Sequence, residues 1–111
     1  MAKATLEEWG VLAVAAHYNA GELAKLCGLS VRQLERHFHG NLGRTPQDWL
    51  NEQRIKAAQH QLLLGQSVKR VALELGFKQV SHFCRQFKSF NNLTPSQFAR
   101  QSQTENYVAG R

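Results

Sequence analysis

Apolar positions recur every three or four residues along most of the chain, which is the spacing at which a helix buries one face. The first such stretch predicts a helix from Thr5 to about Tyr18. A short second helix follows, with Asn19 as its N-cap and Glu22 three residues later as the partner in a capping box. The residues predicted to point inward are Leu6, Trp9, Leu12, Ala13 and Ala16 on the first helix, and Leu23, Leu26 and Leu29 on the second.

A third helix and a longer fourth helix come next. The third is expected over Val31–His39, after the cap residue Ser30, and residues 40–44 form the turn that follows it. The fourth is expected over Pro46–Leu64 and ends at Gly65, because glycine readily takes a left-handed backbone. The predicted inward residues are Leu34 and Phe38 on the third helix, and Trp49, Leu50, Ile55, Ala58 and Leu62 on the fourth.

Three further helices are predicted in the rest of the chain. Ser67 caps the fifth, the sixth covers Gln79–Phe90, and the seventh runs from Pro95 to about Gln101. Their predicted inward residues are Val68, Val71, Ala72, Leu75, Phe83, Phe87, Phe90 and Phe98. Residues 102–111 are mostly polar or small, so we expect a flexible tail there. The whole pattern predicts an all-α protein of seven helices.

Much of this pattern occurs twice. Phe38 and Phe87 are 87 − 38 = 49 residues apart, and the two Thr-Pro pairs at residues 45 and 94 are separated by the same 94 − 45 = 49. Gly28 and Gly76 are only 76 − 28 = 48 apart, so the second copy has one extra residue at its turn or helix start. Threonine as N-cap followed by proline is a helix-start signal in both copies. The shared order indicates a duplicated helix-turn-helix unit.

Specific residues of both copies match a known family. In the second copy they are Ser67-Val68, Val71-Ala72, Gly76-Phe77, Ser81, Phe83, Arg85, Phe87-Lys88 and Thr94-Pro95. The first copy has the weaker set Leu23-Ala24, Gly28-Leu29-Ser30, Leu34, Arg36, Phe38, Gly43 and Thr45-Pro46, and between the copies lie Arg54-Ile55, Ala58 and Leu62-Leu63. Over roughly residues 6–101 the chain therefore resembles the DNA-binding domain of the AraC/XylS family of bacterial transcription regulators.

The resemblance implies a homeodomain-like architecture of two helix-turn-helix subdomains, at residues 5–45 and 66–101, joined by a long linker helix at 46–65. Two positions depart from the family pattern. Asn92 stands where the family usually has glycine, but asparagine tolerates a left-handed backbone, so we expect the turn to survive. Lys78-Gln79 stands where the family favours a small polar cap, which leaves the start of the sixth helix open.

Charge points to a polyanionic partner. The 111 residues carry a formal net charge of +6, and the isoelectric point is about 9.8. Through Arg44 the chain has five basic and four acidic residues, whereas from Gln66 onward it has seven basic and two acidic ones. The second half is therefore expected to supply more of the nonspecific attraction to phosphate. A basic surface without a partner is the alternative on charge alone.

The third and sixth helices carry the candidate DNA-contacting residues. Arginine can hold guanine through two hydrogen bonds, and glutamate can accept one from cytosine. The base-contact candidates are Arg32, Glu35 and Arg36 on the third helix, and Gln79, Ser81, His82 and Arg85 on the sixth. The phosphate-contact candidates are His39, Arg44, Lys69, Lys78, Lys88 and Thr94. An alternative for Glu35 is that it pairs with a neighbouring arginine and contacts no base.

Other classes of function find little support. His37 and His39, like His82 and Cys84, are two residues apart on a helix and diverge, so they are poor zinc ligands. There is no catalytic constellation and no phosphate-binding glycine loop. We therefore expect no enzyme, no cofactor and no metal. A disulfide between Cys27 and Cys84 is not expected in a chain that resembles a cytosolic protein.

The sequence predicts a monomeric, cytoplasmic, nucleoid-associated chain that binds double-stranded DNA. No apolar run is long enough to span a membrane. The competing hypothesis is a protein-interaction module, for example one that binds RNA polymerase, and the nearly neutral first copy suits that role better than the second. The operator, the regulated genes, activation versus repression and any effector or dimerisation domain are not encoded in a recognisable pattern.

Overall fold

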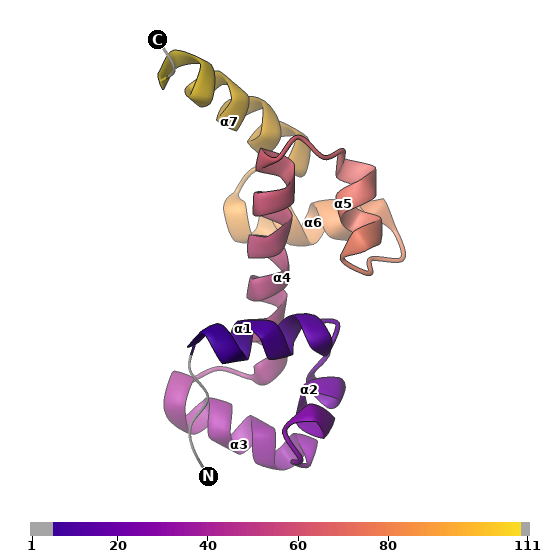
Figure 1. Cartoon of the computed structure of the whole chain (residues 1–111), viewed down its shortest axis with the longest axis vertical. Coiled ribbons are helices and arrows are strands. Elements are labelled where there is room, and N and C mark those ends of the chain that lie inside the picture. The colour runs from indigo at the N-terminus through magenta and orange to yellow at the C-terminus, as the bar shows by residue number, and fades with distance from the viewer. Residues whose placement is uncertain (1–5, 110–111) are drawn as a thin grey trace. The chain divides into compact units, whose positions relative to one another are not determined.

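The computed structural model describes the backbone of residues 6–109 and the side chains of residues 8–102. Over that range it contains seven α-helices and no strand, which confirms the predicted fold class (Figure 1). The helices are α1 (Leu6–Ala15), α2 (Ala20–Leu26), α3 (Val31–Leu42), α4 (Pro46–Leu63), α5 (Val68–Glu74), α6 (Val80–Asn91) and α7 (Pro95–Ala109).

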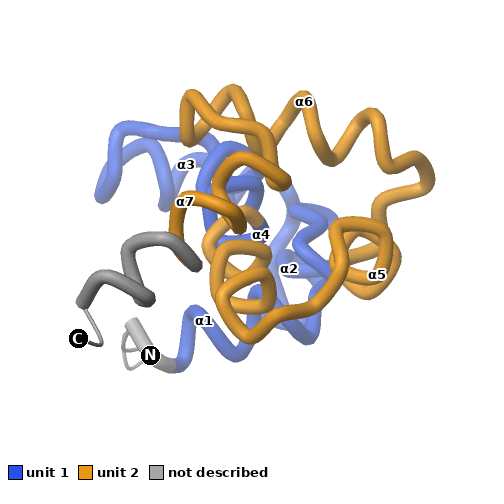
Figure 2. The backbone as a smooth tube through the Cα atoms, turned by 90° about the horizontal axis from the view of Figure 1, so that it is seen from above, with its two compact units in different colours: residues 1–54 blue, residues 55–111 orange. Residues whose placement is uncertain are grey.

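The chain divides into two compact units, Met1–Arg54 and Ile55–Arg111, and the boundary falls within α4 (Figure 2). Unit 1 holds α1, α2, α3 and the first part of α4, and unit 2 holds the rest. Each unit thus has a helix-turn-helix pair, α2 with α3 or α5 with α6, and a stretch of α4.

An aromatic and aliphatic core holds unit 1 together. Leu23, Leu34 and Leu50 are fully buried. The Trp9 ring lies edge-on to Phe38 with centroids 5.4 Å apart, and Phe38 is 5.5 Å from Trp49. Large aromatic side chains bury much apolar area for few rotatable bonds, so three helices are tied together by this cluster.

Unit 2 is built on a row of phenylalanines. Ring centroids are 5.1 Å apart for Phe77 and Phe83, 5.8 Å for Phe83 and Phe87, and 5.4 Å for Phe87 and Phe98. Phe83 and Phe87 are completely buried. Phe87 and Phe98 occupy the positions that Phe38 and Trp49 occupy in unit 1, and the two ring separations are almost equal. The duplicated sequence pattern therefore corresponds to duplicated packing.

Backbone hydrogen bonds repeat as well. In unit 1 the Leu29 amide donates to the Ala24 carbonyl at 2.9 Å, and in unit 2 the Phe77 amide donates to the Ala72 carbonyl at 2.9 Å. Both turns contain a left-handed glycine, Gly28 at φ 69° and Gly76 at φ 82°, as helix C-termini commonly do.

The extra residue of the second copy lies immediately before its recognition helix. One residue, Ser30, separates Leu29 from α3, whereas Lys78 and Gln79 separate Phe77 from α6. Ser30 forms a complete capping box with Gln33, but Gln79 makes no side-chain capping bond. The helix start that the sequence left open is thus at Val80, without a side-chain cap.

Other predicted caps are present, one of them only in part. Asn19 accepts a hydrogen bond from the Glu22 amide, but the Glu22 carboxylate lies 3.3 Å from the Lys25 ammonium instead of completing the predicted box. Thr45 accepts from the Asp48 amide at 3.1 Å. Asn92 is left-handed at φ 60°, so the turn after α6 survives the departure from glycine as expected.

Several predicted boundaries were wrong by a few residues. Helix α1 ends at Ala15 and not near Tyr18, because His17 and Tyr18 have positive φ angles of 53° and 58°. Helix α3 continues past His39 to Leu42, so the turn is confined to residues 43–45. Helix α7 extends beyond Gln101 to Ala109. The start at Thr5, the side chain of Leu6 and most of the predicted tail at 102–111 lie outside the described side chains.

Two predicted core residues are exposed. Leu26 is 51% exposed and Phe90 is 43% exposed. Both lie in the last turn of their helices. Phe77, which the pattern did not place in the core, is buried and begins the aromatic row of unit 2. Spacing alone therefore located the middle of each apolar face better than its ends.

Candidate nucleic-acid interface

Helix α3 presents an exposed polar face. Arg32, Glu35, Arg36 and His39 are all exposed, while Leu34 and Phe38 on the opposite side are buried. In the described part of the chain the Glu35 carboxylate forms no ion pair, so the alternative that it pairs with a neighbouring arginine finds no support here. Hydrogen-bond donors and an acceptor are thus available together on one surface.

One flank of α3 is already committed to the fold. The Gln33 side chain accepts from the Ser30 amide at 2.9 Å, and the His37 ring stacks on Trp9 with centroids 6.0 Å apart. The free stripe is therefore narrower than the set of exposed residues. It consists of positions 1, 2, 5, 6 and 9 of the helix, which neighbour one another on a helical surface: Val31, Arg32, Glu35, Arg36 and His39.

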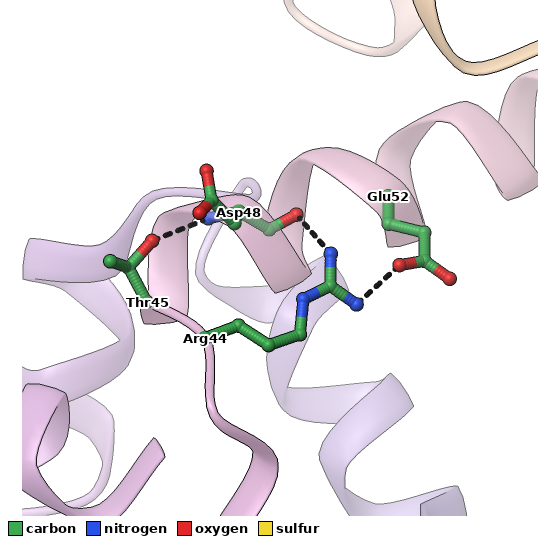
Figure 3. Close-up of polar contacts among 4 residues, drawn as sticks. All are labelled: Arg44, Thr45, Asp48 and Glu52. Atoms are coloured by element: carbon green, nitrogen blue, oxygen red, sulfur yellow. Dashed lines mark hydrogen bonds and ion pairs between the residues drawn. The ribbon is translucent and has the colours of Figure 1, made fainter. Parts of the chain in front are cut away.

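A shallow hollow of about 300 Å³ adjoins this stripe. It is lined by Glu35, Arg36, His39, Arg44 and Thr45. Arg44 is held in place, because its guanidinium donates to the Glu52 carboxylate and, at 3.2 Å, to the Asp48 carbonyl (Figure 3). The structure thus brings four base or phosphate candidates of unit 1 together, and the Glu52 carboxylate neutralises one of them, Arg44.

Helix α6 has the equivalent stripe in unit 2. Val80, Ser81, Arg85 and Lys88 are exposed, and Cys84 between them is half-buried. By the 49-residue interval, Arg36 corresponds to Arg85 and His39 to Lys88, whereas Arg32 corresponds to Ser81 and Glu35 to Cys84. The two stripes share an arginine at one position and a valine at another, and they differ in the other side chains.

Two candidates on unit 2 are placed less favourably. His82 lies edge-on to the buried Phe77 ring with centroids 5.5 Å apart, on the flank that corresponds to Gln33. Gln79 is the residue before α6 and is exposed. Neither belongs to the stripe, although both remain within one helical turn of Ser81. Their proposed base contacts stay predictions.

The remaining phosphate candidates lie at helix starts. Lys69 in the first turn of α5 and Lys78 before α6 are exposed. The Thr94 hydroxyl accepts from the Gln97 amide at 3.1 Å, and the Gln97 side chain accepts from the Thr94 amide at 2.9 Å. Thr94 therefore acts as the cap of α7, which uses one lone pair of its oxygen and leaves the hydroxyl able to donate.

Sequence reasoning missed three members of the two stripes. The sequence does not predict Val31 and Val80 as DNA contacts, because apolar side chains are expected in the core. Both are nevertheless exposed. Cys84 was considered only as a zinc ligand or a disulfide partner, and neither role was expected. The 49-residue interval identifies them, because each corresponds to an exposed residue in the other copy.

The described residues form neither a disulfide nor a metal cluster. Cys27 and Cys84 are free, and burial raises the pKa of the Cys27 thiol. The described side chains contain no cluster of three or more His, Cys, Asp or Glu residues suited to a metal ion. None of the described helices is both long enough and apolar enough to cross a membrane.

Comparison with known families is decisive for the class of protein. A family model described as a helix-turn-helix domain, of AraC/XylS type, matches residues 23–101, which is most of the chain. The chain belongs to the AraC/XylS family. Members of this family are DNA-binding transcription regulators and not enzymes, so the expected class of function is confirmed.

Curated relatives agree with this assignment. An uncharacterized HTH-type transcriptional regulator of Haemophilus influenzae is 35% identical over 80 residues, covering 71% of this chain and 27% of the relative. The transcriptional activator NphR of a Rhodococcus species is 33% identical over 81 residues, covering 72% of this chain and 24% of the relative. The chain thus spans about a quarter of the length of these relatives.

Solved structures show the same fold. An AraC-type transcriptional regulator from Chromobacterium violaceum is 28% identical, with a TM-score of 0.71 over 83% of this chain and 89% of that one. A DNA-binding transcriptional dual regulator from Escherichia coli K-12 has a TM-score of 0.75 over 94% of this chain and 97% of that one. At 21% identity the second likeness concerns the fold alone.

Proposed function

We propose that this AraC/XylS-family chain reads an asymmetric, bipartite DNA site by inserting α3 and α6 into adjacent segments of the major groove. The observation that carries the proposal is the repetition of one exposed stripe on two helices of 12 residues each, both with a buried aromatic face and a left-handed C-cap. A helix of this kind fits the major groove with its first turns against the base edges.

Arg36 and Arg85 are the proposed common readers. They occupy equivalent places and are exposed, and arginine bonded to both O6 and N7 of guanine is the commonest specific contact in the major groove. Each unit is therefore expected to select a guanine through this position. The remaining base candidates, Arg32 and Glu35 against Ser81, differ between the units, so the two half-sites should differ in sequence.

Phosphate contacts are proposed for exposed lysines and one histidine at or near the edges of the two stripes. They fix the register of a helix on the duplex without selecting a base. His39 and Lys88 occupy equivalent places in the third turn of α3 and α6, and Lys69 and Lys78 precede the unit 2 stripe along the chain. Unit 2 therefore carries more of the electrostatic attraction, in keeping with the uneven charge of the sequence.

Selection of bound sequences from a randomised duplex pool, at near-physiological salt, tests this function. Two enriched blocks about one helical turn apart, or about 34–36 Å along the duplex, are expected. A single enriched block would contradict the two-headed reader and leave one unit as scaffold. Absence of any enrichment, with binding that is equally strong on all duplexes, would contradict sequence-specific recognition.

A protein-interaction module, with RNA polymerase as one possible partner, is the second candidate. The observation in its favour is an apolar outer face on α1, where Val11 is 69% exposed and Val14 is 59% exposed. The dependence of binding affinity on salt concentration distinguishes the two hypotheses. DNA binding should weaken steeply as salt rises, because each phosphate contact releases counterions, whereas an apolar protein interface responds little.

A further inference from the structure

The first residue of each recognition helix is an exposed valine. Val31 begins α3 and is 43% exposed, and Val80 begins α6 and is 37% exposed. They are 80 − 31 = 49 residues apart, which is the interval that relates the two helices throughout. Branched apolar side chains slightly disfavour a helix, and at these exposures the fold covers neither valine completely, so each leaves apolar surface available to a partner.

Position on the helix places both valines beside the candidate base readers. One turn separates Val31 from Glu35, and one turn separates Val80 from Cys84, so each valine forms one end of its stripe. Residues in the first turn of a recognition helix are those that contact base edges in helix-turn-helix complexes. In the proposed complex, an apolar side chain at the first position of the helix lies against the base edges of the major groove.

Thymine is the only base with an apolar group in that groove, its C5-methyl. We propose that Val31 and Val80 each contact a thymine methyl, so that each half-site contains a thymine selected by a valine. The inference rests on the DNA-reading function proposed above and adds to it two specificity-determining residues and the base that they select. Because valine has one strongly preferred rotamer in a helix, its methyl groups are fixed before DNA arrives.

The test replaces thymine by deoxyuridine, one position at a time, in a duplex that the chain binds. This exchange removes the methyl group and leaves the base pairing intact. Dissociation constants are measured for the parent chain, Val31→Ala, Val80→Ala and the control Leu73→Ala, whose exposed leucine lies on α5 outside both stripes. Circular dichroism checks that the variants fold, which is expected because both valines are exposed and alanine favours helix.

In each half-site, loss of one thymine methyl should raise the dissociation constant of the parent chain about fourfold. This factor corresponds to the free energy of burying one CH2 group. Val31→Ala should become insensitive to the methyl in one half-site and stay sensitive to that in the other. Val80→Ala should show the converse. Leu73→Ala should respond to both methyls as the parent chain does.

The inference is overturned if no thymine methyl affects binding, or if the alanine variants keep the parent's sensitivity at both positions. In either case the parent chain still binds the duplex, so the DNA-reading function is not contradicted and only the valine assignment falls. The binding of Arg36→Ala and Arg85→Ala to the same duplex tests that function separately. Loss of binding to every duplex by the parent chain would instead contradict the function itself, and the inference with it.

Discussion

The side-chain amide of Gln47 donates to the backbone carbonyl of Tyr18 at 3.0 Å, across 29 residues of sequence. The Gln47 carbonyl oxygen also accepts from the Ala20 amide at 3.0 Å. Gln47 therefore spans the turn that connects α1 to α2, in which His17 and Tyr18 both have left-handed backbones. One side chain of α4 thus holds α2, the first helix of the DNA-reading pair, in unit 1.

Replacing Gln47 by alanine should destabilise unit 1 by about 1–3 kcal/mol, because a part-buried carbonyl and an amide lose their partners. Urea denaturation followed by circular dichroism measures this loss. Gln53→Ala is the matched control, since Gln53 is a half-buried glutamine on the same helix, and it should change stability by much less. Equal losses in the two variants would show that the turn does not depend on Gln47.

Tyr18 makes the stability of unit 1 sensitive to alkaline pH. Burial raises the pKa of the Tyr18 phenol, and the charge of Arg54 partly offsets that rise. A raised pKa in the folded state favours the protonated phenol, so its contribution is complete below the ordinary tyrosine pKa of about 10 and is lost as pH rises through the higher folded value.

Tyr18→Phe should therefore lose less stability than the parent chain as the pH rises above about 10. The free energy of unfolding, measured by urea titration at several pH values, supplies the comparison. Because the variant changes a single phenol, the difference between the two pH profiles isolates Tyr18 from other alkaline groups. Parallel profiles would contradict the assignment.

Asn92 ends α6 with a left-handed backbone at φ 60°. Asn92→Ala should cost about 1 kcal/mol, because a Cβ without a compensating polar group disfavours that conformation, whereas Asn92→Gly should be neutral or slightly stabilising. Thermal unfolding of the two variants measures the difference. Gly43→Ala, at the equivalent place in unit 1 with φ 65°, should repeat the loss. A stable Asn92→Ala variant would show that the turn has another conformation available.

Arg44 and Lys88 were both predicted phosphate contacts, but the structure gives their side chains different surroundings. Arg44 is bound to the Glu52 carboxylate and the Asp48 carbonyl, whereas Lys88 is exposed on the α6 stripe. Lys88→Ala should reduce the slope of log binding constant against log salt by about 1 and leave stability unchanged. Arg44→Ala should instead lower the free energy of unfolding by about 1 kcal/mol with little change in slope. A stability loss in Lys88→Ala together with a smaller salt slope in Arg44→Ala would contradict these two assignments.

Local signals in the sequence predicted the helices and most caps. Ser67 as a cap, the left-handed Gly76 and the buried Phe83 and Phe87 follow from backbone chemistry and helical spacing, and the structure has all four. These features are encoded within a few residues of where they act. The duplicated interval predicted two copies of one helix-turn-helix unit, and the structure adds that Phe38 packs on Trp49 as Phe87 packs on Phe98.

Features that depend on distant partners were not predictable in the same way. The turn after α1 is bound by Gln47, 29 residues later in the sequence, and helical spacing alone did not show that Phe90 is exposed. Nor does sequence order reveal that Arg44 is neutralised by Glu52, eight residues later. The candidate reading residues were found because they are local to two helices, and their base contacts stay predictions.

The central claim is that each unit reads its own half of one DNA site. The most direct measurement is a set of binding titrations of the parent chain, Arg36→Ala, Arg85→Ala and the control Arg70→Ala on the selected duplex and on duplexes with one half-site scrambled. Arg70 is an exposed arginine on α5 that pairs with Glu74 at 2.8 Å and belongs to neither stripe. We predict that Arg36→Ala loses about 1–3 kcal/mol on the intact site and then tolerates scrambling of one half, while Arg85→Ala tolerates scrambling of the other. Equal losses by both variants on every duplex would contradict the claim and make these arginines phosphate contacts.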